Sequence, residues 1–137
     1  MRFFLDANIL VSAIGWPGTE RRLLAAFRGR TDCSICSSPI VLEETLSALV
    51  EEKIMGFSLA REAVDQIRRF SYVEEPLRLP PHPNLPAEDV HVTNALVALV
   101  TGDRKLLHLK EIYGAAVIRT ADALRILGVP VRSRKHI

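Results

Sequence analysis

The chain has 137 residues, of which 48% are hydrophobic and 25% charged, with only two Cys. This composition excludes a disordered chain and a disulfide framework, and no apolar run nears the roughly 20 residues of a membrane-spanning helix. Eighteen Lys and Arg against sixteen Asp and Glu leave a formal charge of +2, which is compatible with nucleic acid without being diagnostic of it. We expect one domain over residues 1–130, a basic tail over 131–137, a cytoplasmic location and no membrane partner.

Short apolar strands alternate with helical segments in the first half of the chain. Residues 2–5 have the pattern of a buried strand that ends at Asp6. Ser38 as N-cap and Pro39 at the first helical position predict a helix to about Lys53. The other elements predicted here are a helix over 20–28, a strand over 33–36, a helix capped by Ser58 and a strand over 71–73.

The second half follows a stretch with four prolines in residues 79–86, which predicts a surface crossing. A helix is predicted to begin near Asp89, and a strand over 95–100 is followed by a short helix. A strand over 115–118 and a last helix capped by Thr120, which stops at Gly128, complete the chain. This alternation indicates an α/β fold, a three-layer sandwich with a parallel sheet of about five strands and helices on both faces.

Several acidic residues fall where such a sheet binds ligands, at the carboxyl ends of its strands. Asp6 and Asp103 come just after predicted strands, Asp89 opens a helix, and Glu43 and Glu44 lie early in the helix after Ser38. Each also has an ordinary explanation, such as a helix N-cap for Asp6 or a complement to a helix N-terminus for Asp89.

A group of carboxylates at one sheet edge repels itself unless a cation neutralises it. Ligands that are all oxygen atoms suit Mg²⁺ or Mn²⁺ rather than Zn²⁺. An ion held by a few carboxylates, with open water positions, is the arrangement that hydrolyses phosphodiesters. Among the basic residues, we expect Arg21, Arg22, Arg104 or Lys105 to hold phosphates that flank the scissile one.

The segments that carry these acids resemble, in order, those of the PIN domain family. They read LDAN at 5–8, SPIVLEE at 38–44, LPAED at 85–89 and VTGD at 100–103. The chain looks like a PIN domain over nearly its whole length, and it is most similar to VapC-like toxins and related toxin–antitoxin PIN proteins of prokaryotes. No single motif is specific, so the ordered set carries the resemblance.

The resemblance implies a PIN-like fold and a Mg²⁺- or Mn²⁺-dependent endoribonuclease that acts on RNA. It also implies a cognate antitoxin, whose C-terminal segment blocks the cleft, and dimers are frequent in the family. Matched residue by residue, it implies catalytic and metal-binding roles for Asp6, Glu44, Asp89 and Asp103. The helical wheel does not choose between Glu43 and Glu44, and the resemblance alone favours Glu44.

Two other interpretations stay open. The stretch after Asp89, residues 90–100, is about one helical turn shorter than is usual in the family, which favours a PIN-like module with a weakened metal site that binds RNA or protein. A haloacid dehalogenase-type hydrolase also places an Asp after its first strand, but its chemistry needs D-x-D, and here Asp6 is followed by Ala7 and Asn8.

The C-x-x-C pair and Trp16 each have a structural and a functional interpretation. Cys33 and Cys36 have C-x-x-C spacing in a strand-like stretch, where buried hydrophobic residues are favoured over a redox pair. Trp16 lies in a loop, where burial in the core is favoured over base stacking or a partner contact.

Overall fold

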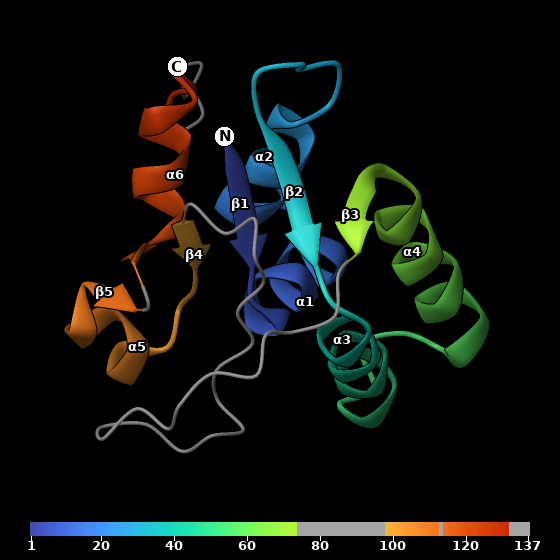
Figure 1. Cartoon of the computed structure of the whole chain (residues 1–137). Helices are drawn as coiled ribbons and strands as arrows, with labels where there is room; N and C mark the ends of the chain where they lie inside the picture. Colours follow the sequence, from blue (N-terminus) through green and yellow to red (C-terminus); the bar gives the residue numbers. More distant parts are fainter. Residues whose placement is uncertain (74–97, 113, 132–137) are drawn as a thin grey trace, which may run out of the picture.

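A six-stranded sheet forms the centre of the molecule in the computed structural model, which describes residues 1–73, 98–112 and 114–131 (Figure 1). The strand order is β3-β2-β1-β4-β6-β5. Every pair from β3 to β6 in this order is parallel, and β5 pairs antiparallel with β6. The strands are β1 (Arg2–Leu5), β2 (Ser34–Ser37), β3 (Ser71–Val73), β4 (Ala98–Val100), β5 (Glu111–Ile112) and β6 (Ala115–Ile118).

The five predicted strands are present and pair in parallel, as expected. The sheet as a whole is not purely parallel, because a sixth strand, β5, pairs antiparallel with β6. The added strand β5 has two residues, which is too short for any hydrophobic periodicity to reveal. The α/β class is therefore correct, with a mixed rather than a parallel sheet. Asp89, the proline-containing stretch and the predicted tail beyond residue 131 lie outside the described residues.

Six helices connect or follow the described strands. Helix α1 packs against α2 and α3, α3 packs against α4, and α2 packs against α6. None of the helices in the described ranges has the length and apolar character needed to cross a membrane. The helices are α1 (Ala7–Gly15), α2 (Thr19–Ala26), α3 (Pro39–Glu51), α4 (Phe57–Phe70), α5 (Arg104–Leu109) and α6 (Thr120–Ile126).

The helix ends follow the local sequence in most places. Ser38 caps α3, since its hydroxyl oxygen accepts from the backbone N–H of Val41 at 3.3 Å. Gly128 ends α6 with a φ of 73°, as predicted. Two predicted caps were wrong by one or two residues: Gly56 precedes α4 in place of Ser58, and Thr120 is the first residue inside α6.

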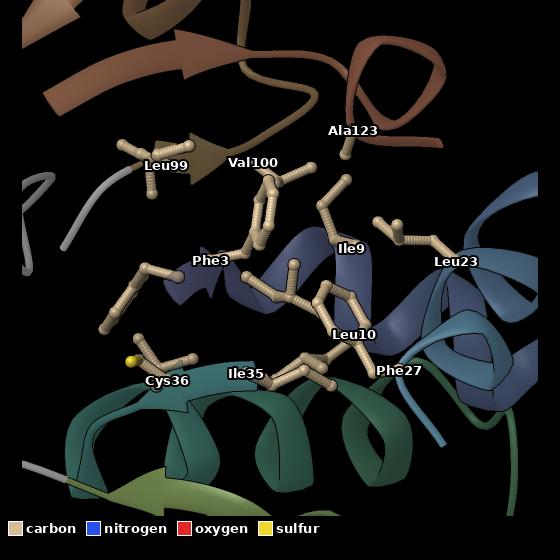
Figure 2. Packing of buried hydrophobic residues seen from close by; sticks show 14 of the residues in the cluster. Phe3, Ile9, Leu10, Leu23, Phe27, Ile35, Cys36, Leu99, Val100 and Ala123 are labelled. Atoms are coloured by element: carbon tan, nitrogen blue, oxygen red, sulfur yellow. The ribbon is translucent and has the colours of Figure 1, made fainter. Parts of the chain in front are cut away.

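Strand β1 lies at the middle of the core, between β2 and β4. Its residues Phe3, Phe4 and Leu5 are almost completely buried, and the Phe3 ring meets the edge of Phe27 with centroids 5.5 Å apart (Figure 2). Cys33 and Cys36 are buried and form no disulfide, which confirms their interpretation as small buried residues. The position of Asp6, directly after β1, is therefore set by the core.

The loop between α2 and β2 is held by ionic and backbone contacts. The Arg30 guanidinium pairs with Asp32 at 2.8 Å and donates to the Leu127 carbonyl at 2.7 Å. The hydrogen bond from Arg30 lowers the pKa of the Asp32 carboxyl to about 2. The amino group of Met1 donates to the Asp32 carbonyl at 2.9 Å, so this loop is joined both to the start of the chain and to the end of α6.

Candidate functional site

The carboxyl ends of β1 and β4 lie side by side. Leu5 pairs with Val100 in the parallel ladder, and the Asp6 N–H donates to the Val100 carbonyl at 3.0 Å. The next residue of the second strand, Thr101, donates its own N–H to the Ile118 carbonyl at 3.0 Å. The ladder therefore places Asp6 beside Thr101, although 95 positions separate them in the chain.

The Thr101 hydroxyl links the two aspartates predicted for this edge. It donates to Asp6 Oδ2 at 2.8 Å and accepts from the backbone N–H of Asp103 at 3.0 Å. Because Thr101 is fully buried, this hydroxyl has little alternative to these two partners. The Asn8 side-chain oxygen adds a contact by accepting from the Gly102 N–H at 3.3 Å. Asp6 and Asp103 thus share one hydrogen-bonded network.

Both carboxylates also cap helices, so their ordinary explanation is confirmed as well. Asp6 Oδ1 accepts from the Ala7 N–H at the start of α1, and Asp103 Oδ1 accepts from the Lys105 N–H at the start of α5, each at 2.9 Å. An ionised carboxylate has about four acceptor positions, so capping leaves room for a cation. Neither aspartate forms an ion pair with any residue that the structure describes.

Among the described residues, neither Glu43 nor Glu44 joins this pair in a group able to hold a metal ion. Glu43 and Glu44 both lie on exposed positions of α3, and Asp89 is outside the described residues. Within ranges 1–73, 98–112 and 114–131, no three or more His, Cys, Asp or Glu side chains form a group able to hold a metal ion. The roles of Glu44 and Asp89 therefore remain predictions.

The residues present nevertheless fit a hard divalent cation. Mg²⁺ is commonly held by one or two carboxylates, with water and substrate oxygen atoms completing its shell. Asp6 and Asp103 supply two partly buried carboxylates, and the Thr101 hydroxyl fixes the orientation of one of them. Supporting hydrogen bonds of this kind hold metal-binding side chains in place.

A cavity of about 420 Å³ adjoins this network. Thr101 and Gly102 line it, and so do the cationic side chains of Arg104 and Arg119, together with the carboxylate of Glu20. Among the described residues, neither guanidinium group forms an ion pair with a carboxylate, although the backbone N–H of Arg119 donates to Asp122 Oδ2 at 3.2 Å. Two guanidinium groups beside a pair of carboxylates suit a ligand that carries phosphate groups.

The structure corrects which arginines are able to contact such a ligand. Arg21 donates to the carbonyls of Ala13 and Ile14, each at 2.9 Å, and Arg22 donates to the Val131 carbonyl at 2.6 Å. Arg21 and Arg22 therefore support the fold and do not line this cavity, and Arg104 is the predicted residue that does. Arg119 was missed, although it directly follows the strand β6 and so satisfies the rule that drew attention to Asp6.

Trp16 is 53% exposed, so the expectation of a core position was wrong. It lies in the loop between α1 and α2, three positions before Thr19, which lines the cavity. An exposed ring in this loop is available for stacking or for a partner contact.

Replacing Thr101 by Val should weaken Mn²⁺ binding about 10- to 100-fold, the range typical for the loss of a residue that supports a metal ligand. The change keeps the side-chain volume but removes the donor to Asp6 and the acceptor for the Asp103 N–H. Isothermal titration calorimetry with Mn²⁺ measures the effect, and Thr101→Ser, which keeps the hydroxyl, is the matched control. Equal affinities of the Val and Ser variants would show that the hydroxyl does not orient the site.

Comparisons of the chain with models of known protein families, with curated proteins and with solved structures found no match.

Proposed function

We propose that this chain is a Mg²⁺- or Mn²⁺-dependent endoribonuclease with a PIN-like three-layer arrangement, and that it is the toxin of a toxin–antitoxin pair. The observation that carries the proposal is the Thr101 hydroxyl, which joins the Asp6 carboxylate to the backbone N–H of Asp103 at the ends of two adjacent parallel strands. The ordered resemblance of the sequence to PIN proteins supports the same conclusion. Phosphodiester hydrolysis is the chemistry that such a pair serves once a divalent ion is bound.

Each residue has a distinct task in this proposal. Asp6 and Asp103 hold the ion, and Glu44 and Asp89 are proposed to complete its protein ligands. When bound, the ion supplies an acidified water and neutralises charge that builds on the phosphate. Arg104 and Arg119 bind phosphates next to the scissile one, because guanidinium groups make paired, charge-assisted hydrogen bonds to phosphate oxygens.

An inhibitory partner belongs to the proposal. A cognate antitoxin would place its C-terminal segment over the edge where Asp6 and Asp103 meet, and so exclude RNA. A homodimer of the chain is proposed from the resemblance as well. Titrating the purified chain with candidate antitoxin peptides during RNA cleavage would test whether inhibition and RNA binding exclude each other.

The decisive experiment is metal-dependent RNA cleavage by the purified chain. The protein is stripped with EDTA and incubated with labelled single-stranded and structured RNA, after which Mg²⁺ or Mn²⁺ is added back. We expect no cleavage without a divalent ion and internal cuts when either ion is restored. Cleavage that persists in EDTA would contradict the proposal, and so would intact RNA at saturating concentrations of both ions.

Replacing Arg104 and Arg119 together by Gln should raise the KM for RNA by roughly 100-fold or more, because each of the two lost hydrogen bonds to a charged group contributes about 1.5–3 kcal/mol. The salt dependence of binding should also become shallower, since fewer phosphates are neutralised. Steady-state cleavage at several salt concentrations measures both quantities. The matched control is Arg125→Gln, because Arg125 is exposed on α6 and pairs with Asp122. An unchanged KM in the double variant would show that RNA does not bind in the cavity lined by Arg104 and Arg119.

A second function, binding of RNA or protein without cleavage, is favoured by two features of the described residues. Both aspartates are used as helix caps, and the described part of the chain contains no group of three acids. A module that binds RNA or protein without cutting would have these features. Tight RNA binding without turnover in saturating Mn²⁺ would favour this function over the nuclease.

A further inference from the structure

A second, larger cavity of about 900 Å³ lies at the opposite end of the sheet from Asp6. It is formed by the loop between α2 and β2, the last turn of α4 and the edge strand β3. Figure 1 shows this loop and the turn from α4 into β3 at one end of the sheet, while β1 and β4 point toward the other end. We call it the β3 groove, and its size is that of a pocket for a small ligand or a few nucleotide units.

The charge of the β3 groove is positive. Arg28, Arg30 and Arg69 line it, and its lining includes no Asp or Glu. Arg30 is fixed by Asp32 and by the Leu127 carbonyl, so it shapes the loop. Arg28 and Arg69 are exposed and have no ion pair with a described residue, so their charges are available to a ligand in the groove.

Aromatic side chains stand beside these cations. Phe70 is 40% exposed and Tyr72 is 54% exposed, although both rings are large and apolar enough to favour burial. The Arg2 guanidinium lies over the Tyr72 ring, 4.5 Å from its centre. Parallel pairing of Ile35 with Ser71 keeps the α2–β2 loop and the end of α4 together, which brings Arg28 and Arg69 to the same groove.

We propose that the β3 groove binds a stretch of single-stranded nucleic acid, with bases against Phe70 and the part of the Tyr72 ring that Arg2 leaves exposed, and phosphates against Arg28 and Arg69. Exposed rings that alternate with unpaired cations are the features that hold single strands without sequence preference. Charge complementarity favours a polyanion, and the two exposed rings favour bases over an acidic peptide, which needs cations alone. The groove is remote from the acidic pair, so this binding does not depend on whether the chain cleaves RNA.

The test measures binding to a fluorescein-labelled oligouridylate of about ten nucleotides, a length within the usual range for one binding domain. The full chain carries Asp6→Asn throughout, so that cleavage does not destroy the probe. Fluorescence anisotropy compares Arg28→Glu/Arg69→Glu with the control Arg61→Glu/Arg125→Glu. The two double variants have the same net charge, and neither control residue lines the groove. A DNA oligomer of equal length shows whether the 2′-hydroxyl contributes.

We expect the groove variant to raise the Kd about 10- to 100-fold and the control to change it by less than about threefold. Tyr72→Ala should weaken binding and Tyr72→Phe should restore it, because Phe keeps the ring. Equal weakening by both double variants, or no binding of either oligomer by the parent chain, overturns the proposal. If the true ligand of the groove is an acidic protein, neither oligomer will bind the parent chain.

Hydrogen exchange locates the binding site without the groove variants, so the test does not depend on whether those variants fold. Adding the oligomer should protect backbone amides in residues 28–35 and 69–72 of the Asp6→Asn chain. Protection confined to residues 101–105 would place the strand at the acidic edge and overturn the groove assignment. Loss of cleavage in the parent chain with groove protection intact would instead contradict the nuclease proposal alone.

Discussion

Replacing Asp6 by Asn should abolish RNA cleavage while leaving the fold intact. Asn caps helices as well as Asp does, so the start of α1 is kept, while the negative charge and the second acceptor oxygen, which binds the Thr101 hydroxyl, are removed. The loss should exceed the roughly hundredfold effect seen when a residue that merely supports a metal ligand is removed, because Asp6 is proposed to contact the ion itself. Single-turnover cleavage in saturating Mn²⁺ measures the rate.

A second carboxylate-to-amide change separates this effect from a general loss of charge. Asp65→Asn removes a partly exposed charge on α4, where Asp65 pairs with Arg61, and should leave cleavage unchanged. Thermal unfolding of Asp6→Asn should lie close to that of the parent chain. Metal-dependent cleavage retained by a folded Asp6→Asn protein would refute the assignment of Asp6 as a ligand and leave it only its cap.

The sequence predicts the positions of Asp6 and Asp103 because each comes shortly after a strand, and because the ends of parallel strands meet at one edge of the sheet. Asp6 directly follows an apolar strand, Asp103 follows a Thr-Gly turn after another, and parallel sheets bring such ends to one edge. The bridge between them was not predictable, because it depends on Leu5 pairing with Val100. Sequence patterns do not encode register between strands that are 95 residues apart.

The arginines that line the cavity were harder to predict from the sequence than the aspartates. Arg21 and Arg22 lie near the start of α2 and were expected to contact phosphates, yet both donate to backbone carbonyls. Whether an arginine faces a ligand or satisfies a carbonyl depends on packing against remote elements, here the end of α1 and Val131. Arg119 was identifiable by its place after a strand, and only the structure shows it beside Arg104.

The β3 groove was beyond sequence reasoning for a related reason. The clusters around Arg28 and Arg69 are 41 positions apart and each reads as an exposed helix face or loop. Their meeting follows from the β2–β3 pairing, which no local signal predicts. The rule used for the site also directs attention to the carboxyl ends of the strands, whereas this groove lies at the amino ends of β2 and β3.

Replacing Phe3 by Ala should lower the free energy of unfolding by about 3–5 kcal/mol, the range for deleting a buried aromatic ring. Phe3 is fully buried in the central strand, and its ring centre lies 5.5 Å from that of Phe27; both residues are labelled in Figure 2. The strand ends at Leu5, directly before Asp6. Urea denaturation measures the change, and an unaltered m value would show that the same surface is exposed on unfolding.

Phe57→Ala is the matched control, because Phe57 is 59% exposed at the start of α4 and its loss leaves no cavity in the core. We expect this control to cost less than about 1 kcal/mol. Saturating Mn²⁺ should stabilise the Phe3→Ala protein less than the parent chain, since the stability added by an ion grows with the logarithm of the affinity of the folded site. Equal costs for the two variants would show that β1 is not the centre of the core, and the position argued for Asp6 would lose its foundation.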